Sequence, residues 1–235
     1  MLFLFQRQYY TEFHPDAWIT QPWNAWSSVA LLLPAFFWAW ALRGQYLRYI
    51  GLLPILPLAL VNGVGSFMWH ATSEPGIYLD LDTKPPLLLL GWLGIYFCRL
   101  LTGRWWAGIL VFVAFAYGVM ELKEMARPLL DVGSITFNYI FNATVVILPG
   151  LIVMIKYRGA GWGWVIFTLA LLLIAIQFRI YDGHRPMFSW MPQGTHFLWH
   201  IACALAYLPL GKYIVVLEDR YRERKADRAM LRAQA

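Results

Sequence analysis

The sequence is short of charged residues. Asp, Glu, Lys and Arg make up 14% of its 235 residues, whereas a soluble globular domain is about one quarter charged. Hydrophobic residues make up 60% of the chain, which is more apolar material than one water-soluble core can hide. The composition therefore argues against a soluble all-α protein and favours a chain that is surrounded by lipid.

Cysteine is also scarce, with two residues in the chain. Cys98 and Cys203 both fall inside long apolar runs, where a free cysteine behaves as a small apolar residue. We therefore expect no disulfide, and the two cysteines do not indicate a redox compartment.

Long apolar runs are what the sequence has in abundance. A membrane-spanning helix needs ~20 apolar residues to cross a hydrocarbon layer of ~30 Å, and helices are expected because a span must satisfy its backbone polar groups internally. The runs that approach this length are residues 24–42, 49–69, 85–101, 105–120, 135–155, 162–178 and 195–217. The sequence thus predicts an all-α integral membrane protein, a seven-transmembrane helix bundle that forms a single domain over residues 1–235.

Basic residues are unevenly distributed among the connections between these runs. With the N-terminus outside, 13 of the 19 basic residues fall on the cytoplasmic side, as the positive-inside rule requires. These are Arg43, Arg48, Arg99, Arg104, Lys156, Arg158, Lys212, Arg220, Arg222, Arg224, Lys225, Arg228 and Arg232. We therefore expect an outer N-terminal segment at 1–23 and a cytoplasmic basic tail at 218–235. The net charge of +6 then points to an anionic lipid bilayer as the partner of the tail, and not to nucleic acid.

Polar side chains interrupt the second apolar run near its end. Asn62, Ser66 and His70 are spaced four residues apart and so share one face of a helix. Such residues within a span are costly and are functional candidates by default. The alternative is a polar seam in which Asn and Ser bond across helices, since Gly63 and Gly65 permit close helix approach.

Two histidines open the seventh run. His196 and His200 are one helical turn apart, so both can ligate one metal ion, as in the paired histidines of helical zinc proteases. The alternative is a pair of interfacial histidines that face lipid headgroups.

Two carboxylates, Asp80 and Asp82, lie at or just before the start of the third run. Taken by themselves, they are better explained by an ordinary outer loop with an Asp helix cap. In the predicted topology, however, the end of the second run and the start of the third and seventh lie on the same side. His70, His196 and His200 can then converge near the outer leaflet, and three histidines with an open position form the ligand set of a hydrolytic zinc site.

These residues resemble the CREST superfamily of membrane hydrolases, which contains the alkaline ceramidases, the adiponectin-receptor-like proteins and the haemolysin III proteins. The resemblance is strongest to the alkaline ceramidase family and extends from about Trp23 to Arg224. It rests on the pattern Ser66-x-x-x-His70, Asp82, His196-x-x-x-His200, and on the local motifs Trp23-Asn24-Ala25-Trp26-Ser27-Ser28, Gly63-Val64-Gly65-Ser66 and His70-Ala71-Thr72.

The resemblance implies a role for each site residue. His70, His196 and His200 would be the zinc ligands, and Ser66 would polarise the scissile carbonyl or hold its oxyanion. The catalytic aspartate would orient the attacking water or take its proton. Asp82 is preferred because the family motif has Pro three residues after its Asp, as Pro85 stands here, and Asp80 is held in reserve.

The chain departs from the family in its N-terminal calcium-binding cluster. Ceramidases of this branch carry a Glu three residues before the Asn of the entry motif, and here that position is Gln21. Glu12, Asp16 and Asn24 remain, so the chain is expected to offer fewer ligands for a Ca²⁺ ion than members of the family do.

The expected function is therefore that of a zinc-dependent membrane hydrolase. It would cleave the amide bond of a long-chain lipid such as ceramide by attack of zinc-bound water, and so belong to sphingolipid metabolism. The alternatives are a receptor-like protein, lipid esterase or regulator of the same fold with a mainly structural zinc, and a haem-binding or metal-transporting protein. His14 and His184 are expected to be solvated. The expected location is a multi-pass position in a bacterial inner membrane or a eukaryotic ER or Golgi membrane.

Overall fold

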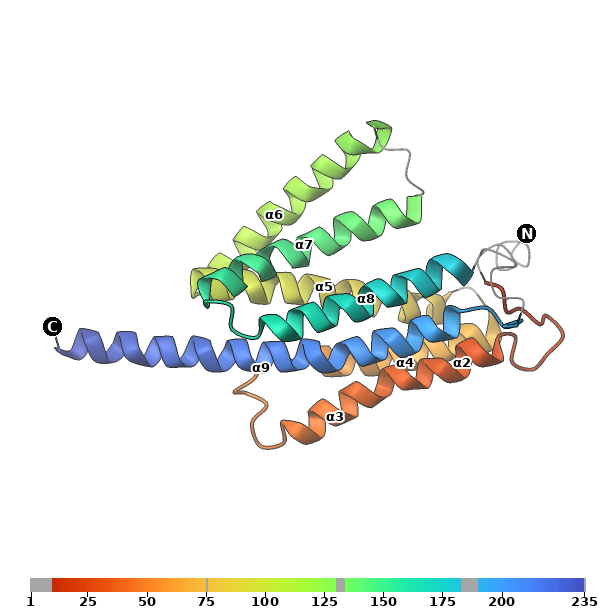
Figure 1. Ribbon diagram of the computed structural model, residues 1–235, viewed down its shortest axis with the longest axis horizontal. Helices are drawn as coiled ribbons and strands as arrows, with labels where there is room; N and C mark the ends of the chain where they lie inside the picture. The colour runs from red at the N-terminus through yellow and green to blue at the C-terminus, as the bar shows by residue number, and fades with distance from the viewer. Residues whose placement is uncertain (1–9, 75, 130–133, 183–189, 235) are drawn as a thin grey trace. The chain divides into compact units, whose positions relative to one another are not determined.

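The computed structural model describes residues 10–74, 76–129, 134–182 and 190–234 of the chain, and every regular element in these ranges is a helix (Figure 1). In chain order these are α2 (Pro22–Ser28), η1 (Val29–Leu32), α3 (Leu33–Ala41), α4 (Ile55–Thr72), α5 (Ile77–Thr102), α6 (Trp105–Ala126), η2 (Arg127–Leu129), α7 (Ser134–Lys156), α8 (Trp162–Asp182) and α9 (His196–Gln234). The predicted all-α class is confirmed over these ranges.

Within the part of the chain that the structure describes, four helices are long and apolar enough to cross a membrane, namely α5, α6, α8 and α9. In α6 and in α8, only 11% of the most apolar stretch of 18 residues is buried within the protein. Large apolar side chains such as Leu110 and Val113 on α6, and Phe167 and Leu173 on α8, are exposed. Lipid is the solvent that would cover such surfaces. The number of seven spans and the orientation of the termini stay predictions.

Several helix bounds differ from the predicted runs. Residues 49–54 form turns, so α4 begins at Ile55, because the residue before a proline such as Pro54 is biased away from helix. Helix α5 begins at Ile77, eight residues before Pro85, which places Asp80 and Asp82 inside a helix. The predicted tail is not separate, since α9 continues without a break to Gln234.

The chain forms two compact units. The first unit comprises Met1–Pro86 and Trp162–Val215, and the second comprises Leu87–Gly161 and Val216–Ala235. All the site residues proposed from the sequence belong to the first unit.

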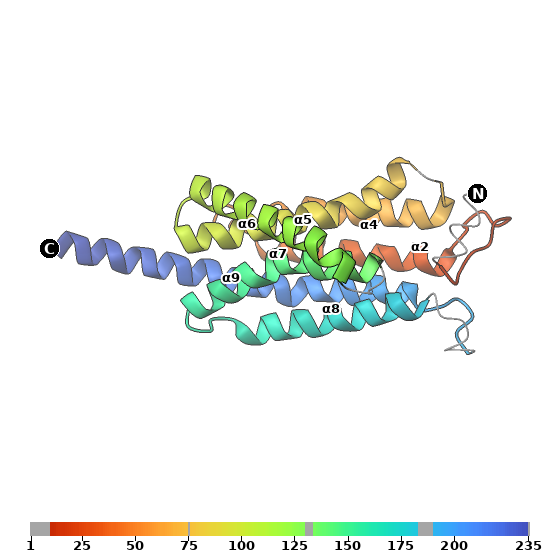
Figure 2. The ribbon, with the colours of Figure 1, turned by 90° about the horizontal axis from the view of Figure 1, so that it is seen from above.

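In the first unit α2 and α3 pack on α4, and α8 runs beside the first half of α9 (Figure 2). A close approach of α4 to the start of α5 depends on Gly65. A Cβ atom at this position would lie 2.4 Å from Cβ of Leu81 and 2.7 Å from its carbonyl oxygen. Any larger residue would therefore push these helices apart.

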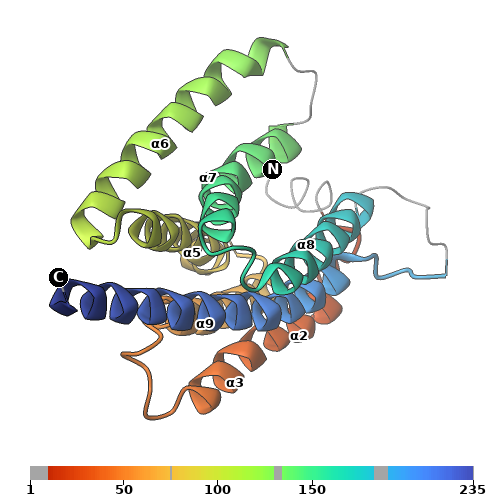
Figure 3. The ribbon, with the colours of Figure 1, turned by 60° about the vertical axis from the view of Figure 1, so that its left-hand side comes forward.

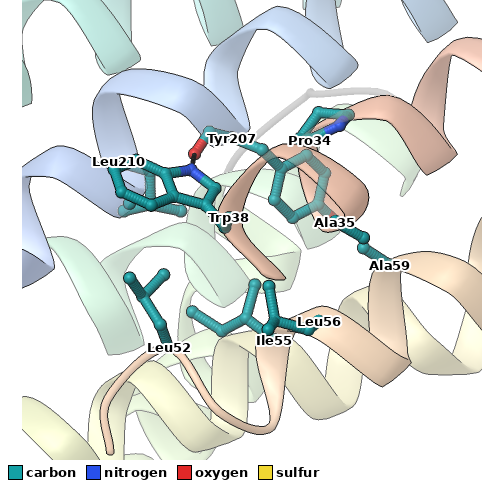
Figure 4. Close-up of a pocket in the computed structure, with 10 residues that line it drawn as sticks. Pro34, Ala35, Trp38, Leu52, Ile55, Leu56, Ala59, Tyr207 and Leu210 are labelled. Atoms are coloured by element: carbon teal, nitrogen blue, oxygen red, sulfur yellow. Dashed lines mark hydrogen bonds between the residues drawn. The ribbon is translucent and has the colours of Figure 1, made fainter. Parts of the chain in front are cut away.

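A small apolar pocket lies farther along the first unit (Figure 4). The Trp38 indole closes one side of it and donates a hydrogen bond to the carbonyl oxygen of Tyr207 at 3.2 Å. A Cβ at Gly211 would lie 2.3 Å from the Trp38 ring, so glycine is required for the indole to pack on α9. The pocket is lined by Pro34, Ala35, Trp38, Leu52, Ile55, Leu56, Ala59, Tyr207, Leu210 and Gly211.

The second unit contains α5 from Leu87 onward, α6, α7 and the last part of α9. Helices α6 and α7 contact each other, but they diverge over much of their length (Figure 3). The core of this unit holds a buried ion pair, in which Arg99 donates to Glu218 at 3.1 Å and the Tyr96 hydroxyl donates to the same oxygen at 3.0 Å. Lys156 donates to the carbonyl oxygens of Leu100 and Leu101 at 2.8 and 2.7 Å. A basic side chain thus satisfies the free carbonyls at the C-terminal end of α5.

Candidate metal centre

Three histidines meet in the first unit. The candidate ligand atoms of His70, His196 and His200 all lie within 4.8 Å of one another. The ring centroids are 4.7 to 5.1 Å apart, and the three residues are 0%, 2% and 3% exposed. A buried group of three imidazoles at this spacing could hold one metal ion.

The local sequence places each histidine at a helix end. His70 lies in the last turn of α4, while His196 and His200 lie in the first two turns of α9. The predicted spacing of one turn is what presents His196 and His200 to the same centre. The prediction that the three histidines could form a metal site is confirmed.

Gln21 sets the tautomer of His70. Its Oε1 lies 2.8 Å from Nδ1 of His70, and an amide oxygen can only accept a hydrogen bond. Nδ1 therefore carries the proton and Nε2 keeps its lone pair. Nε2 of His70 is buried and has no hydrogen-bond partner among the described residues, which is costly for a polar atom and is what a metal ligand requires.

Ser27 does the same for His200. The Ser27 hydroxyl donates to the carbonyl oxygen of Asn24 at 3.0 Å, so its oxygen accepts from Nδ1 of His200 at 2.9 Å. Nε2 of His200 is thereby left as the acceptor. Such outer hydrogen bonds fix the orientation and the basicity of ligating histidines, so His70 and His200 fit a metal ion.

Asp182 holds the start of α9 in place. One oxygen of its carboxylate accepts from the backbone N–H groups of Thr195 and His196 at 2.7 and 3.0 Å, and the other accepts from the N–H of Thr11 at 3.1 Å. A carboxylate at a helix N-terminus is favoured by the helix dipole. Gly194 has a φ of +75°, and a Cβ there would lie 2.2 Å from the Asp182 carboxylate. The Asp182 cap therefore positions His196.

Ser66 and Asp82 form a pair beside the histidines. Ser66 is fully buried one turn before His70, and its hydroxyl bonds to the Asp82 carboxylate and lies 3.0 Å from Oγ of Ser28. Pro86 has no N–H to donate to the carbonyl oxygen of Asp82, four residues earlier. Asn62 supplies that hydrogen bond at 2.6 Å, which explains how α5 continues through its prolines.

Asp80 points elsewhere. It is exposed and forms an ion pair with Lys84 at 2.7 Å, one turn along α5. Two residues apart on a helix are separated by about 200° around the axis, so Asp80 and Asp82 cannot share a face. The structure brings Asp82 to Ser66 and leaves Asp80 away from it.

Tyr10 and Arg179 complete the surroundings of the histidines. The Tyr10 ring packs edge-on against His70 and His196, with centroids 5.1 and 4.7 Å apart. Burial raises the pKa of the Tyr10 hydroxyl, which bonds to Trp69 and to Arg179. The Arg179 guanidinium lies 3.3 Å from Nδ1 of His196 and over the Trp199 ring at 5.7 Å.

In the predicted calcium cluster, the Glu12 carboxylate has other partners. Both oxygens of Glu12 accept backbone N–H groups of α2, from Trp23 at 3.0 Å and Asn24 at 2.9 Å. Burial raises the pKa of the Glu12 carboxyl. Asp16 is exposed, and the histidine triad is the one group of three or more His, Cys, Asp or Glu placed for an ion among the described residues. The loss of part of the family's calcium cluster stays a prediction.

The two histidines outside the triad are His14 and His184. His14 is exposed, as expected, and its backbone N–H bonds to Thr20 at 2.8 Å. His184 lies outside the described residues.

The sequence assigned no role to Tyr10, Arg179 or Asp182, it included Ser27 only as part of the motif from Trp23 to Ser28, and it considered Gln21 only as a lost calcium ligand. For Arg179 and Asp182 a signal was present, since both lie within about one helical turn of an uncharged apolar run, and ionisable residues within a span are functional candidates by default. No comparable sequence pattern indicates that Tyr10, Ser27 and Gln21 contact the histidines.

Comparison of the chain with models of known protein families and with curated proteins gives no match.

Proposed function

We propose that this protein is a zinc-dependent membrane hydrolase that cleaves the amide bond of a long-chain lipid, with ceramide as the leading candidate. The observation that carries the proposal is the buried histidine triad with a Ser66–Asp82 pair one helical turn from His70. Structural zinc sites use four protein ligands, whereas three histidines leave one position open for chemistry. The CREST resemblance supports the same reaction class.

Zinc is the proposed ion, and when bound it would supply a hydroxide nucleophile at neutral pH. His70, His196 and His200 would hold it. Asp82, which is half-buried on α5, would accept a proton as a general base. Ser66 would donate its hydroxyl to the carbonyl oxygen of the lipid, where negative charge develops during acyl transfer. Asp80, paired with Lys84, would have no part in the reaction.

The exposed apolar faces of α6 and α8 support a membrane location, and we propose that the chain is a multi-pass integral membrane protein with seven spans. The segment α2–η1–α3 covers residues 22–41 without interruption, and α4 has 18 residues. At 1.5 Å per residue, each comes close to the ~30 Å of a hydrocarbon layer. These two segments and α7, added to the four long apolar helices, would make seven membrane spans.

The experiment that tests the proposal combines metal analysis with turnover. Purified protein in detergent or nanodiscs is analysed for zinc and is then incubated with ceramides, N-acyl amino acids and matched long-chain esters. We expect fatty-acid release from an amide, loss of this activity on chelation, and recovery with added zinc. Stoichiometric zinc without hydrolysis of any substrate would favour the receptor-like or regulatory alternative, and release from esters alone would make the protein a lipid esterase.

A further inference from the structure

The three histidines are not prepared for metal binding in the same way. His70 and His200 each face an acceptor through Nδ1, the Gln21 amide oxygen at 2.8 Å and the Ser27 hydroxyl at 2.9 Å. His196 faces the Arg179 guanidinium instead, with NH1 3.3 Å from its Nδ1.

A guanidinium group has only donors and keeps its proton in proteins. A neutral imidazole has one donor nitrogen and one acceptor nitrogen, so Nδ1 of His196 must accept from Arg179 and Nε2 must carry the proton. In this arrangement neither nitrogen is available to a metal ion. Ligation through Nδ1 requires Arg179 to leave that atom. Ligation through Nε2 requires the proton to move to Nδ1, which would then oppose a donor.

We propose that Arg179 is a positioning residue that acts through His196 and restrains metal loading, because the guanidinium and the ion compete for the same imidazole. This inference rests on the proposed metal centre but not on the reaction carried out there. The restraint is also electrostatic, since a fixed positive charge beside the triad repels a divalent cation. After release from His196, Arg179 keeps partners within reach, because its guanidinium already lies over the Trp199 ring at 5.7 Å and bonds to Tyr10.

The test is the zinc affinity of the full-length protein, measured by competition with a chromophoric chelator after metal has been stripped. Partners of metal-ligating histidines commonly change affinity by about 10-fold to 100-fold. Arg179→Gln should bind zinc tighter by this factor, whereas loss of a merely structural contact would weaken binding. Arg179→Lys should keep most of the restraint, because its ammonium group is also a pure donor that can face Nδ1 of His196. Arg104→Gln, at an exposed position in the second unit, should leave the affinity unchanged.

A double-mutant cycle separates a contact with His196 from a general charge effect. The gain from Arg179→Gln should shrink to less than about threefold in a His196→Ala background if the guanidinium acts through that imidazole. An equal or weaker zinc affinity in Arg179→Gln, with folding verified by thermal unfolding, would overturn the inference, and so would an undiminished gain without His196. If Arg179→Gln does not fold, Arg179→Met is used and must show the same gain.

The two proposals fail in different ways. Absence of turnover with a clear affinity difference would reject the hydrolase and leave the role of Arg179 intact. Turnover together with equal zinc affinities of the wild-type and Arg179→Gln proteins would support the hydrolase and reject the role of Arg179. Absence of zinc binding in both wild-type and Arg179→Gln proteins would reject both.

Discussion

The amide oxygen of Gln21 lies 2.8 Å from Nδ1 of His70. Gln21 is fully buried and also accepts from Asn24 and donates to Ser73. Hydrogen bonds at both the oxygen and the nitrogen of its amide group therefore fix the orientation of the Gln21 side chain. The consequence is a histidine whose Nε2 is held ready as a ligand.

Gln21→Ala should accordingly weaken zinc binding by about 10-fold to 100-fold, because His70 loses the partner that fixes its tautomer and ring orientation. The measurement is the same chelator competition. Gln177→Ala, at an exposed position on α8, is the matched control and should change nothing. An unchanged affinity in Gln21→Ala would mean that His70 is not oriented by this contact.

Each histidine of the triad should be necessary for the metal. We expect about one zinc per chain in the wild type, and Ala at His70, His196 or His200 should remove most of it, because two imidazoles cannot hold the ion as three do. Elemental analysis of purified protein gives the ratio. His14→Ala is the control, since His14 is exposed. Full zinc content in any triad variant would show that its histidine is not a ligand.

Substitution of Asp82 and substitution of Asp80 should have clearly different effects on the rate of lipid hydrolysis. Asp82→Asn should lower the rate of lipid hydrolysis by about 10²-fold or more while zinc stays bound, since general-base catalysis contributes about this much. Asp80→Asn should have little effect, because Asp80 is exposed and contacts Lys84. Rates are compared at equal zinc content. The opposite ranking would transfer the role to Asp80.

Gly65 should be intolerant of any side chain. Its Cβ would lie 2.4 Å from Leu81, whose backbone is part of α5 and cannot easily yield, and overpacking of this kind costs about 1–3 kcal/mol. Gly65→Ala should therefore lower the unfolding temperature in detergent. Gly91→Ala is the control within α5, where a Cβ meets nothing within 4 Å, and it should be neutral or stabilising. Equal behaviour of the two variants would contradict the close contact between α4 and α5.

The predicted topology is tested by cysteine labelling on intact cells. In a background with Cys98 and Cys203 replaced by alanine, a membrane-impermeant reagent should label Trp190→Cys and not Arg228→Cys. Both positions are exposed. Labelling of Arg228→Cys alone would invert the orientation and place the triad near the cytoplasmic leaflet.

The sequence by itself determined the class of the protein and the identity of the candidate ligands. Hydrophobic runs of helical length require an all-α chain, because composition and length act locally. The four-residue spacing of His196 and His200 likewise places both on one helix face in any context. His70 could be added because Asn62, Ser66 and His70 repeat the same spacing.

Only the tertiary structure decided how these histidines are prepared. Gln21 and His70 are 49 residues apart, and Ser27 and His200 are 173 residues apart. No local pattern specifies which donor or acceptor will face Nδ1 after packing. The difference between His70, which meets an amide oxygen, and His196, which meets the Arg179 guanidinium, arises from the packing of separate helices.

The choice between Asp80 and Asp82 shows the same boundary between sequence and structure. In a loop, two carboxylates separated by one residue are equivalent, and the sequence could prefer Asp82 only through a family motif. The structure starts α5 at Ile77, and a helix turns neighbours two apart onto nearly opposite faces. Because Gly65 lets α4 approach at Leu81, Asp82 meets Ser66 while Asp80 is left at the surface with Lys84.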